Sequence, residues 1–480
     1  MIMRSDLVFR SNFSQIQKIL KGFNSIHFIG IGGIGMSALA KVMFELGYQI
    51  SGSDIKENNL IDSLRKRGIK IYGKHSSKNI KDADLIVMSS AISLDNPELS
   101  EARKRKIPIL SRGKLLSYLV NAGEGIVVAG THGKTTTTSL AASLLLKAGK
   151  NPTIFVGGEL SEIGGNSCLG TGRYIVAESD ESDGSFLFLH PKIAILTSLE
   201  DDHLGYYGSQ DKLDQAFKKF SFQLKSGGIL IANWDDEKIR KISQNLSKSS
   251  SQSIIFYGLH GGALYAEKIK YYSLNSSFQV KYKTKLLGEI DLPLPGEHNI
   301  YNCLAALSVG ISLDIPWNKA KEALSSFQGV KRRFEIIGEA CSVLIVDDYA
   351  HHPTEIKAAL EAARKTNRRI IAVFQPHRYT RTKLFLDKFS LAFQKVDILI
   401  LTQIYGAGEY PLPGVNGKLL FKVIKRERTL PTYYLDTFEE IIDFLVKQVR
   451  KGDLVITIGA GNIREVGEKL YNYLATDLRR

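Results

Sequence analysis

The segment Gly130 to Thr136, with the sequence GTHGKTT, constrains the fold of this chain more than any other stretch. An apolar run ends at Ala129 and another apolar stretch follows from 139 to 146, so we expect a turn between a buried strand and a helix. Glycines let a backbone approach a phosphate closely, and the first N–H groups of a helix donate to it. The segment therefore predicts a cradle for a nucleoside triphosphate.

Individual residues of this cradle have expected roles. Lys134 can reach the terminal phosphates, and the hydroxyl of Thr135 lies where a phosphate-bound Mg²⁺ would be held. The usual pattern has a further glycine five residues before Gly133, where this chain has Val128. The predicted nucleoside triphosphate contacts of the cradle are Gly130, Thr131, His132, Gly133, Lys134, Thr135 and Thr136.

A second glycine-rich turn lies near the N-terminus. It follows the apolar strand pattern 26–29, opens a helix, and has Asp54 at the end of the next predicted strand, about 20 residues on. This fingerprint predicts a diphosphate at a helix start, with a ribose near Asp54. A nicotinamide cofactor is one ligand of that shape, so an oxidoreductase remains an alternative. The glycines concerned are Gly30, Gly32, Gly33 and Gly35.

Two acidic clusters follow apolar runs downstream of the cradle. The segment 178–183 is ESDESD, and 200–203 is EDDH. The carboxyl ends of parallel strands share one edge of a sheet, so Glu178 and His203 are predicted to hold Mg²⁺ beside the triphosphate, with Thr135. Taken alone, each cluster could be a solvated loop.

Length and composition bound the remaining possibilities. A chain of 480 residues suggests about three domains. No apolar run approaches the roughly 20 residues of a membrane span, and the N-terminal residues carry no apolar signal core, so we expect a cytoplasmic protein without membrane insertion. The net charge is +15, but the basic residues are dispersed, which favours small phosphorylated ligands over nucleic acid.

The C-terminal third repeats the alternation of strand and helix patterns. Apolar runs at 344–346, 370–374, 398–401 and 454–457 each end in polar, charged or glycine-rich residues, which predicts a doubly wound sheet with its loops lining a cleft. Just before this region, Asn299 and Asn302 lie one helical turn apart. Their amides could hold an adenine, or they could simply cap the helix.

Together these motifs resemble the Mur ligase family from about residue 25 to about 465. The resemblance rests on the two glycine-rich turns, ESDESD, Asp202-His203, His298-Asn299 with Asn302, and the segments 332–334, 347–353 and 375–381. It implies an α/β protein of three domains. These are a Rossmann-like parallel sheet for a UDP sugar (1–123), a P-loop ATPase-type α/β domain with a small accessory sheet (124–326), and a doubly wound Rossmann-like ligase domain (327–480).

The resemblance also implies a reaction and its participants. It indicates the member that uses ATP and Mg²⁺, without an organic prosthetic group, to join L-alanine to UDP-N-acetylmuramate in peptidoglycan synthesis. A relative that attaches a recycled tripeptide is the alternative, and a monomer or a homodimer is expected. The implied catalytic residues are Lys134, Glu178, His203, Arg333, Asp348, His351, His377, Arg378 and Arg381; Asn299, Asn302, Arg333 and Asp348 also contact ATP, and Ser53, Asp54 and Ser90 join the glycines at the UDP sugar.

This sequence departs from the family pattern at a few positions. Gly205 and Ser198 replace an acidic residue and an asparagine that are common near the metal site. Phe217 lies near the position where sibling ligases carry a carbamylated lysine, so this chain is expected to lack that group, as the alanine-adding member does.

Overall fold

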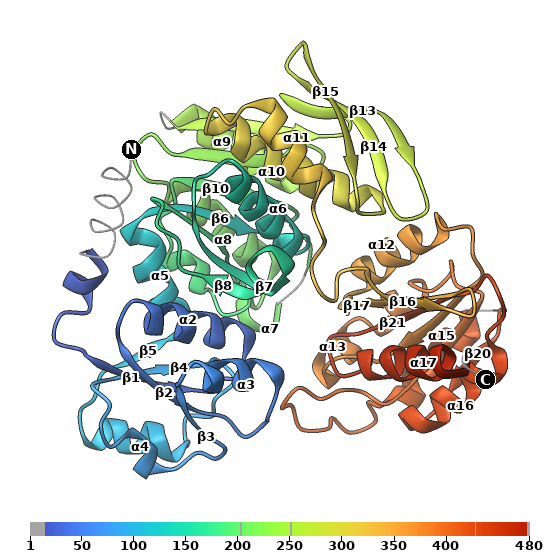
Figure 1. Cartoon of the computed structure of the whole chain (residues 1–480), viewed down its shortest axis with the longest axis horizontal. Helices are drawn as coiled ribbons and strands as arrows, with labels where there is room; N and C mark the ends of the chain where they lie inside the picture. Colours follow the sequence, from blue (N-terminus) through green and yellow to red (C-terminus); the bar gives the residue numbers. More distant parts are fainter. Residues whose placement is uncertain (1–14, 202–203, 250–251, 428, 478–480) are drawn as a thin grey trace. The chain divides into compact units, whose positions relative to one another are not determined.

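The computed structural model describes residues 15–201, 204–249, 252–427 and 429–477 (Figure 1). The chain divides into two compact units, Met1–Lys268 with Gln279–Ile290 and Tyr301–Gln328, and Ile269–Phe278 with Asp291–Ile300 and Gly329–Arg480. Three sheets with flanking helices confirm the predicted α/β class. Within the described ranges, no helix is long and apolar enough to cross a membrane.

The N-terminal sheet is fully parallel, with the order β3-β2-β1-β4-β5. The chain turns from β1 first toward β2 and β3 and then back to β4, which places a switch point at the end of β1, where ligands of such sheets bind. Its elements are β1 Ser25–Ile29, α2 Ile34–Glu45, β2 Gln49–Ser53, α3 Asn59–Lys66, β3 Lys70–Tyr72, β4 Leu85–Met88, α4 Pro97–Lys104, β5 Ile109–Ser111 and α5 Arg112–Ala122.

The central sheet has the order β15-β14-β13-β12-β11-β10-β6-β9-β7-β8. The strands at the β15 end, where we expected a small accessory sheet, are continuous with the central sheet, because β12 pairs with both β11 and β13. The strands are β6 Glu124–Ala129, β7 Thr153–Leu160, β8 Gly165–Cys168, β9 Tyr174–Glu178, β10 Ile193–Leu196, β11 Ile229–Asn233, β12 Ser253–Gly258, β13 Leu264–Tyr271, β14 Ser276–Tyr282 and β15 Lys285–Leu292.

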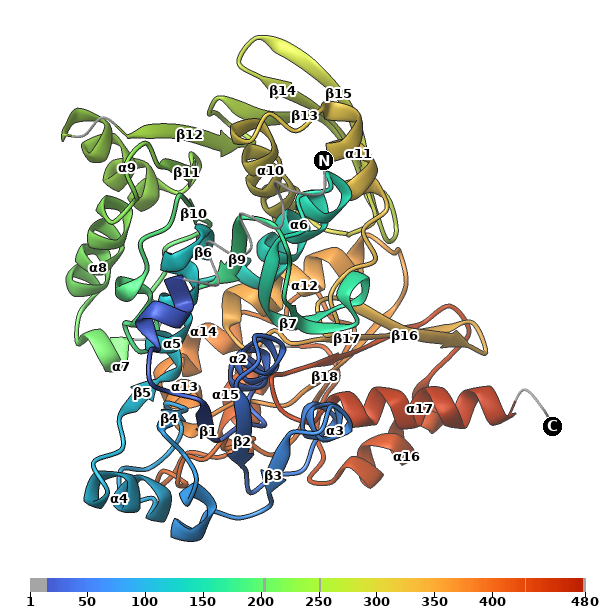
Figure 2. The same ribbon diagram turned by 60° about the vertical axis from the view of Figure 1, so that its left-hand side comes forward.

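The helices of this region flank the sheet. Figure 2 shows α8 and α9 side by side near β10 and β11. Phe217, on α8, is 1% exposed and packs its ring 5.1 Å from that of Phe186, so it is an aromatic side chain of the core. The helices are α6 Lys134–Lys147, α7 Leu204–Tyr207, α8 Gln210–Phe222, α9 Glu237–Ser249, α10 Glu297–Ser312 and α11 Trp317–Ser325.

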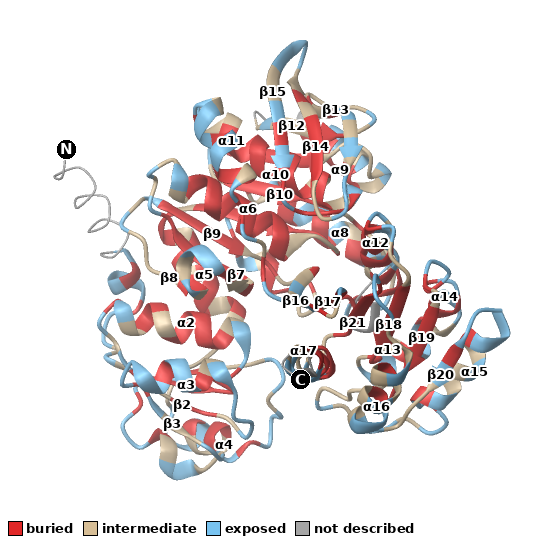
Figure 3. Ribbon diagram, turned by 45° about the vertical axis from the view of Figure 1, so that its right-hand side comes forward, coloured by how far each residue is buried: buried red, intermediate tan, exposed pale blue. Residues whose placement is uncertain are grey.

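The C-terminal sheet has the order β16-β17-β21-β18-β19-β20, with β16 antiparallel to β17 and the other pairs parallel. The strands β17, β18, β19 and β21 are buried throughout (Figure 3). The elements are β16 Glu335–Ala340, β17 Val343–Asp348, α12 Pro353–Arg364, β18 Ile370–Phe374, α13 Tyr379–Leu384, α14 Leu386–Ser390, β19 Ile398–Leu401, α15 Gly417–Glu427, β20 Thr432–Tyr434, α16 Phe438–Gln448, β21 Leu454–Ile458 and α17 Arg464–Asp477.

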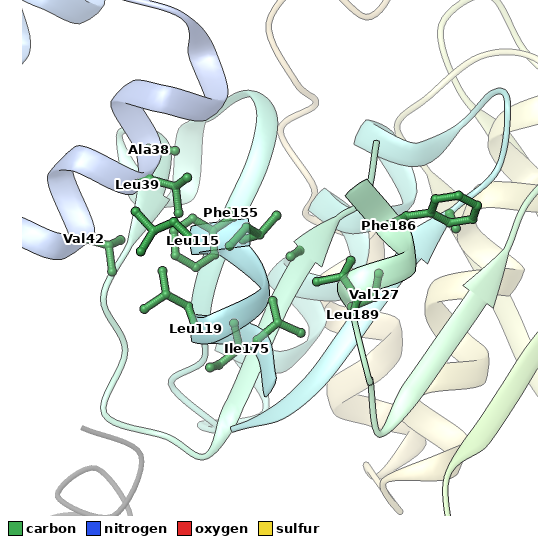
Figure 4. Packing of buried hydrophobic residues seen from close by; sticks show 14 of the residues in the cluster. Ala38, Leu39, Val42, Leu115, Leu119, Val127, Phe155, Ile175, Phe186 and Leu189 are labelled. Atoms are coloured by element: carbon green, nitrogen blue, oxygen red, sulfur yellow. The ribbon is translucent and has the colours of Figure 1, made fainter. Parts of the chain in front are cut away.

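The N-terminal and central sheets share a continuous hydrophobic core inside the first unit. Figure 4 shows Leu39 and Val42 of α2 beside Leu115 of α5 and Phe155 of β7. Polar contacts reinforce this packing: Lys41 Nζ donates to the carbonyl of Ser167 at 2.6 Å. Helix α2, which begins at the first glycine-rich turn, is therefore fixed against the hairpin of β7 and β8.

Candidate active site

The cradle follows β6 as a tight turn that requires glycine at two positions. Gly130 and Gly133 have φ angles of +138° and +78°. A Cβ on Gly130 would overlap the hydroxyl of Thr197, and a Cβ on Gly133 would overlap the carboxamide of Asn302. Both positions therefore combine a left-handed or unusual backbone with close neighbours, which excludes any larger residue.

Ser198 holds the cradle in place from the end of β10. Its carbonyl accepts the N–H of Thr131 at 2.8 Å, and its hydroxyl accepts the N–H of His132 at 2.9 Å. The hydroxyl of Thr197 donates to the carbonyl of His132 at 2.6 Å. The departure to serine at 198 thus keeps a side-chain acceptor for the loop.

Lys134, the first residue of α6, is tied to the loop and to an acidic partner. Its Nζ donates to the carbonyls of Gly130 and Thr131 at 2.6 and 3.2 Å, and to Oε1 of Glu181 at 2.8 Å. Burial lowers the pKa of Lys134, but the carboxylates of Glu181, Asp180 and Glu178 together outweigh burial, so the pKa is raised above its ordinary value. Burial raises the pKa of Glu181 to about 7 despite the opposing charge of Lys134.

The predicted metal ligands Thr135 and Glu178 lie together. The strands β9 and β10 pair with β6 on its two sides, so the end of β9 borders the cradle. The hydroxyl of Thr135 donates to Oε2 of Glu178 at 2.8 Å. A hydroxyl beside a carboxylate supplies the oxygen ligands that Mg²⁺ prefers, and Mg²⁺ keeps several waters, so these two residues fit the ion. His203 lies outside the described residues.

Asn302 lies at the cradle, where its Oδ1 accepts the hydroxyl proton of Thr137 at 3.1 Å. Asn299 is on the same helix and donates from Nδ2 to the carbonyl of Pro295 at 2.7 Å. Asn302 thus forms part of the cradle wall, whereas the bond from Asn299 to Pro295 secures the turn that leads into α10.

The first glycine-rich turn is fixed by the end of β2. The carbonyl of Ser53 accepts the N–H groups of Gly30 and Ile31 at 2.8 and 3.1 Å. Oδ2 of Asp54 accepts the N–H of Gly32 at 2.9 Å, so the residue expected near a ribose also organises the turn. Gly30 has φ +81°, Gly33 caps α2, Gly35 lies in its first turn, and Ser90 is exposed in the turn after β4.

Arg112, which sequence reasoning missed, lies between the first turn and the acidic cluster. A Cβ on Gly35 would lie 3.2 Å from Nη1 of Arg112. The guanidinium pairs with Asp180 at 2.9 Å and lies 3.8 Å from Asp183. Arg112 follows Ser111, whose side chain caps α5, and this local pattern gives no sign of a partner 68 residues away.

The second unit gathers Asp348, His351 and Arg333 at the end of β17. Asp348 accepts the N–H groups of Phe334 and Ala350 at 2.8 and 2.7 Å. Burial raises the pKa of Asp348 to about 6, against the opposing charge of Arg333. Burial lowers the pKa of His351 to about 4, and its Nδ1 lies 3.0 Å from the carbonyl of Tyr349.

The residues predicted after β18 join this group. The ring of His377 is 5.6 Å from that of His351 and stacks on Tyr405 at 5.8 Å. Arg381 Nη1 lies 3.3 Å from Nδ1 of His377. Burial and the neighbouring His351 and arginines lower the pKa of His377 to about 2, so both imidazoles are neutral at pH 7.

Arg378 has φ +69° at the start of α13. Its N–H donates to the carbonyl of Tyr405 at 2.8 Å, which secures this left-handed backbone. Arg333, with its guanidinium 5.3 Å from the ring of Tyr349, completes the cationic side of the group. The aromatic residues Tyr349 and Tyr405 were not predicted, because nothing in their local sequence distinguishes them from core tyrosines.

Comparisons with known proteins agree with this architecture. Residues 25–123 match the Mur ligase family catalytic domain, 128–310 the Mur ligase middle domain, and 332–461 the Mur ligase glutamate ligase domain. UDP-N-acetylmuramate--L-alanine ligases of Desulforamulus reducens and Dictyoglomus turgidum are 44% and 45% identical to this chain. The matches cover 94% and 93% of this chain, and 97% and 96% of those proteins.

Solved structures extend the likeness to three dimensions. The UDP-N-acetylmuramate-alanine ligase of Thermotoga maritima has a TM-score of 0.81 at 31% identity, covering 94% of this chain and 99% of that one. A murein peptide ligase of Psychrobacter arcticus has a TM-score of 0.71 at 25% identity, covering 95% and 99%. With matches along nearly its whole length, this chain belongs to the Mur ligase family.

Proposed function

We propose that this protein uses ATP to join L-alanine to the lactyl carboxylate of UDP-N-acetylmuramate, with release of ADP and inorganic phosphate. The observation that carries the proposal is full-length similarity to proteins named for this reaction, in both sequence and fold. A glycine-rich phosphate cradle with a lysine and a paired hydroxyl and carboxylate supports the same reading.

The proposed reaction requires that ATP first activates the carboxylate. A carboxylate is a poor electrophile and does not condense with an amine in neutral water. Transfer of the γ-phosphoryl group of ATP to the lactyl oxygen gives an acyl phosphate and ADP. The alanine nitrogen then attacks the acyl carbon, and the C–O bond to phosphate breaks. The main task of the protein is to position substrates and to screen charge.

We assign the phosphoryl-transfer step to the first unit. The N–H groups at the start of α6 and the ammonium of Lys134 would bind the β- and γ-phosphates. On ATP binding, the ammonium of Lys134 would leave the carboxylate of Glu181 and contact phosphate oxygens. Its side chain is flexible, and its Nζ already lies beside the carbonyl of Gly130. Thr135 and Glu178, with His203, would hold Mg²⁺, which supplies charge neutralisation for the phosphates.

We assign the amino acid to the second unit. With His351 and His377 neutral, the positive charge of this group comes from its arginines. Arg378 and Arg381 would therefore pair with the alanine carboxylate, and the imidazoles would act as neutral hydrogen-bonding groups. Arg333 and Asp348 would contribute to nucleotide binding, as would Asn299 and Asn302.

A coupled ADP-release assay tests the proposal. The protein is given ATP, Mg²⁺ and UDP-N-acetylmuramate with L-alanine, glycine, D-glutamate or the murein tripeptide in separate reactions. We expect ADP release and a new amide product with L-alanine at the highest kcat/KM. Preference for the tripeptide would assign the protein to peptide recycling. A change in NADH fluorescence on mixing, without ADP release, would support the oxidoreductase alternative.

A further inference from the structure

A buried polar cluster lies behind the first glycine-rich turn, and its centre is Glu98. This residue is the second of α4, directly after Pro97, and its side chain has 0% exposure. The N–H of Glu98 donates to the side chain of the capping residue Asn96 at 2.9 Å. A carboxylate in the first turn of a helix is favoured by the helix dipole, but complete burial requires that its oxygens also accept hydrogen bonds.

Donors from separate segments satisfy this carboxylate. Oε2 accepts the hydroxyl proton of Ser53 at 2.7 Å and lies 3.0 Å from Nδ1 of His75. Oε1 accepts from Nδ2 of Asn79 at 2.6 Å and lies 3.5 Å from Nε2 of His27. Burial alone would raise the pKa of Glu98, yet the nearby ring of His27 and the hydrogen bonds from Ser53 and Asn79 lower it to about 2, so the group is a carboxylate throughout the working pH range.

The cluster also fixes the proton of a histidine. The hydroxyl proton of Ser53 is used in the bond to Glu98, so Ser53 Oγ, 2.9 Å from Nδ1 of His75, can only accept from that nitrogen. Nδ1 of His75 therefore carries a proton, which it shares between Ser53 and Glu98.

Ser53 connects this cluster to the turn. Its hydroxyl is held by Glu98, and its carbonyl accepts from Gly30 and Ile31, the first two N–H groups after β1. The next residue, Asp54, accepts from Gly32. The path of the turn, and so the direction of the N–H groups at the start of α2, depends on where the end of β2 is held.

We propose that Glu98 is a positioning residue of the sugar-nucleotide site: it fixes Ser53, and through Ser53 it fixes the first glycine-rich turn in the shape that receives the diphosphate. The inference rests on the proposed function, in which this turn binds UDP-N-acetylmuramate. Glu98 is fully buried, and we assign it no direct contact with substrate. A buried carboxylate that only stabilised the fold would not be expected to affect one substrate more than the others.

The test is equilibrium binding of UDP-N-acetylmuramate to the full-length protein, with KM measured for each substrate and the melting temperature recorded. Glu98→Gln places an amide donor against Ser53 or Asn79. We expect binding to weaken about tenfold, the equivalent of about 1.4 kcal/mol. KM for ATP and for L-alanine, and kcat, should stay within about twofold. Glu101→Gln on the same helix is the matched control and should bind like wild type.

Ser53→Ala provides a second variant that retains the carboxylate. If Glu98 acts through Ser53, the double variant should bind UDP-N-acetylmuramate no more weakly than the single variant with the lower affinity. Both substitutions remove the same hydrogen bond, so their losses do not add. Additive losses would overturn the proposal. So would a Glu98→Gln protein with a lower melting temperature but wild-type sugar-nucleotide affinity, or with equal losses for all three substrates. Failure of the wild type to bind UDP-N-acetylmuramate would instead refute the proposed function.

Discussion

From the contact between Lys134 and Glu181 we predict that replacing the lysine lowers both the free energy of unfolding and the rate of catalysis, and that the two effects can be separated. Lys134→Met removes the ammonium 2.8 Å from a carboxylate whose side chain is 3% exposed. Breaking a buried pair typically costs about 3–5 kcal/mol, because the remaining charge has no partner. Loss of the lysine should also lower kcat at least a hundredfold, since a charge that stabilises phosphoryl transfer is worth about 3 kcal/mol.

The loss of stability should depend on pH with a defined sign. Burial already raises the folded-state pKa of Glu181 from its ordinary value to about 7, and removal of the lysine raises it further. A carboxyl with a raised folded-state pKa contributes its full stability below the unfolded pKa and loses it as pH rises toward the folded pKa. Lys134→Met should therefore lose about 1.4 kcal/mol per pH unit across that window, and most at pH 8 and above.

Denaturant unfolding at pH 6 and pH 8, with ADP release measured in parallel, tests this reasoning. Adding Glu181→Gln to Lys134→Met should restore stability at pH 8 but not activity, because it removes the buried charge and returns no cation. Lys147→Met is the control: Lys147 pairs with Glu322 on the surface, and its loss should cost less than about 1 kcal/mol. A double variant as unstable at pH 8 as Lys134→Met would refute the reasoning.

Three further perturbations test other parts of the first unit. Glu178→Gln should raise the Mg²⁺ concentration for half-maximal ADP release about 100-fold, because it removes an anionic ligand; an unchanged Mg²⁺ titration would contradict the metal assignment. Gly133→Ala should abolish ATP binding measured by calorimetry, since φ is +78° and the new Cβ meets Asn302. A double-mutant cycle of Arg112→Ala and Asp180→Ala, read by denaturant unfolding, should give a coupling of about 1 kcal/mol for this half-buried pair; zero coupling would show that the contact is energetically neutral.

The sequence predicted those parts of the site that follow from strand order and local turn chemistry. Thr135 and Glu178 are far apart in the chain, but each follows a strand of one parallel sheet, and strand ends of that sheet share an edge. The glycine turns were predictable because glycines between an apolar strand and a helix mark backbone that other residues rarely adopt. Their φ angles and close neighbours in the structure agree with this. Proximity of these groups is therefore a consequence of topology.

Pairs made by long side chains across segments were not predictable. Glu181 lies three residues beyond Glu178 in an acidic run, and spacing alone does not show which carboxylate contacts Lys134 and which contacts Thr135. Glu98 presents the same difficulty, since a glutamate near a helix start is usually solvated. Only the fold reveals that its carboxylate is buried among donors from distant segments.

The first unit also holds its two glycine-rich turns in one framework, as the proposed reaction requires. Helix α2 begins at the first turn and packs on β7, which pairs with β9, and β9 ends at Glu178. Asn166 of β8 donates to the carbonyl of Ile34 at 2.6 Å, so the start of α2 is bonded directly to this sheet. A displacement of 1 Å between reacting groups can cost about a hundredfold in rate. A shared core that fixes both helix starts is therefore a direct way to hold the acceptor carboxylate and the γ-phosphate of the proposed reaction at a fixed separation.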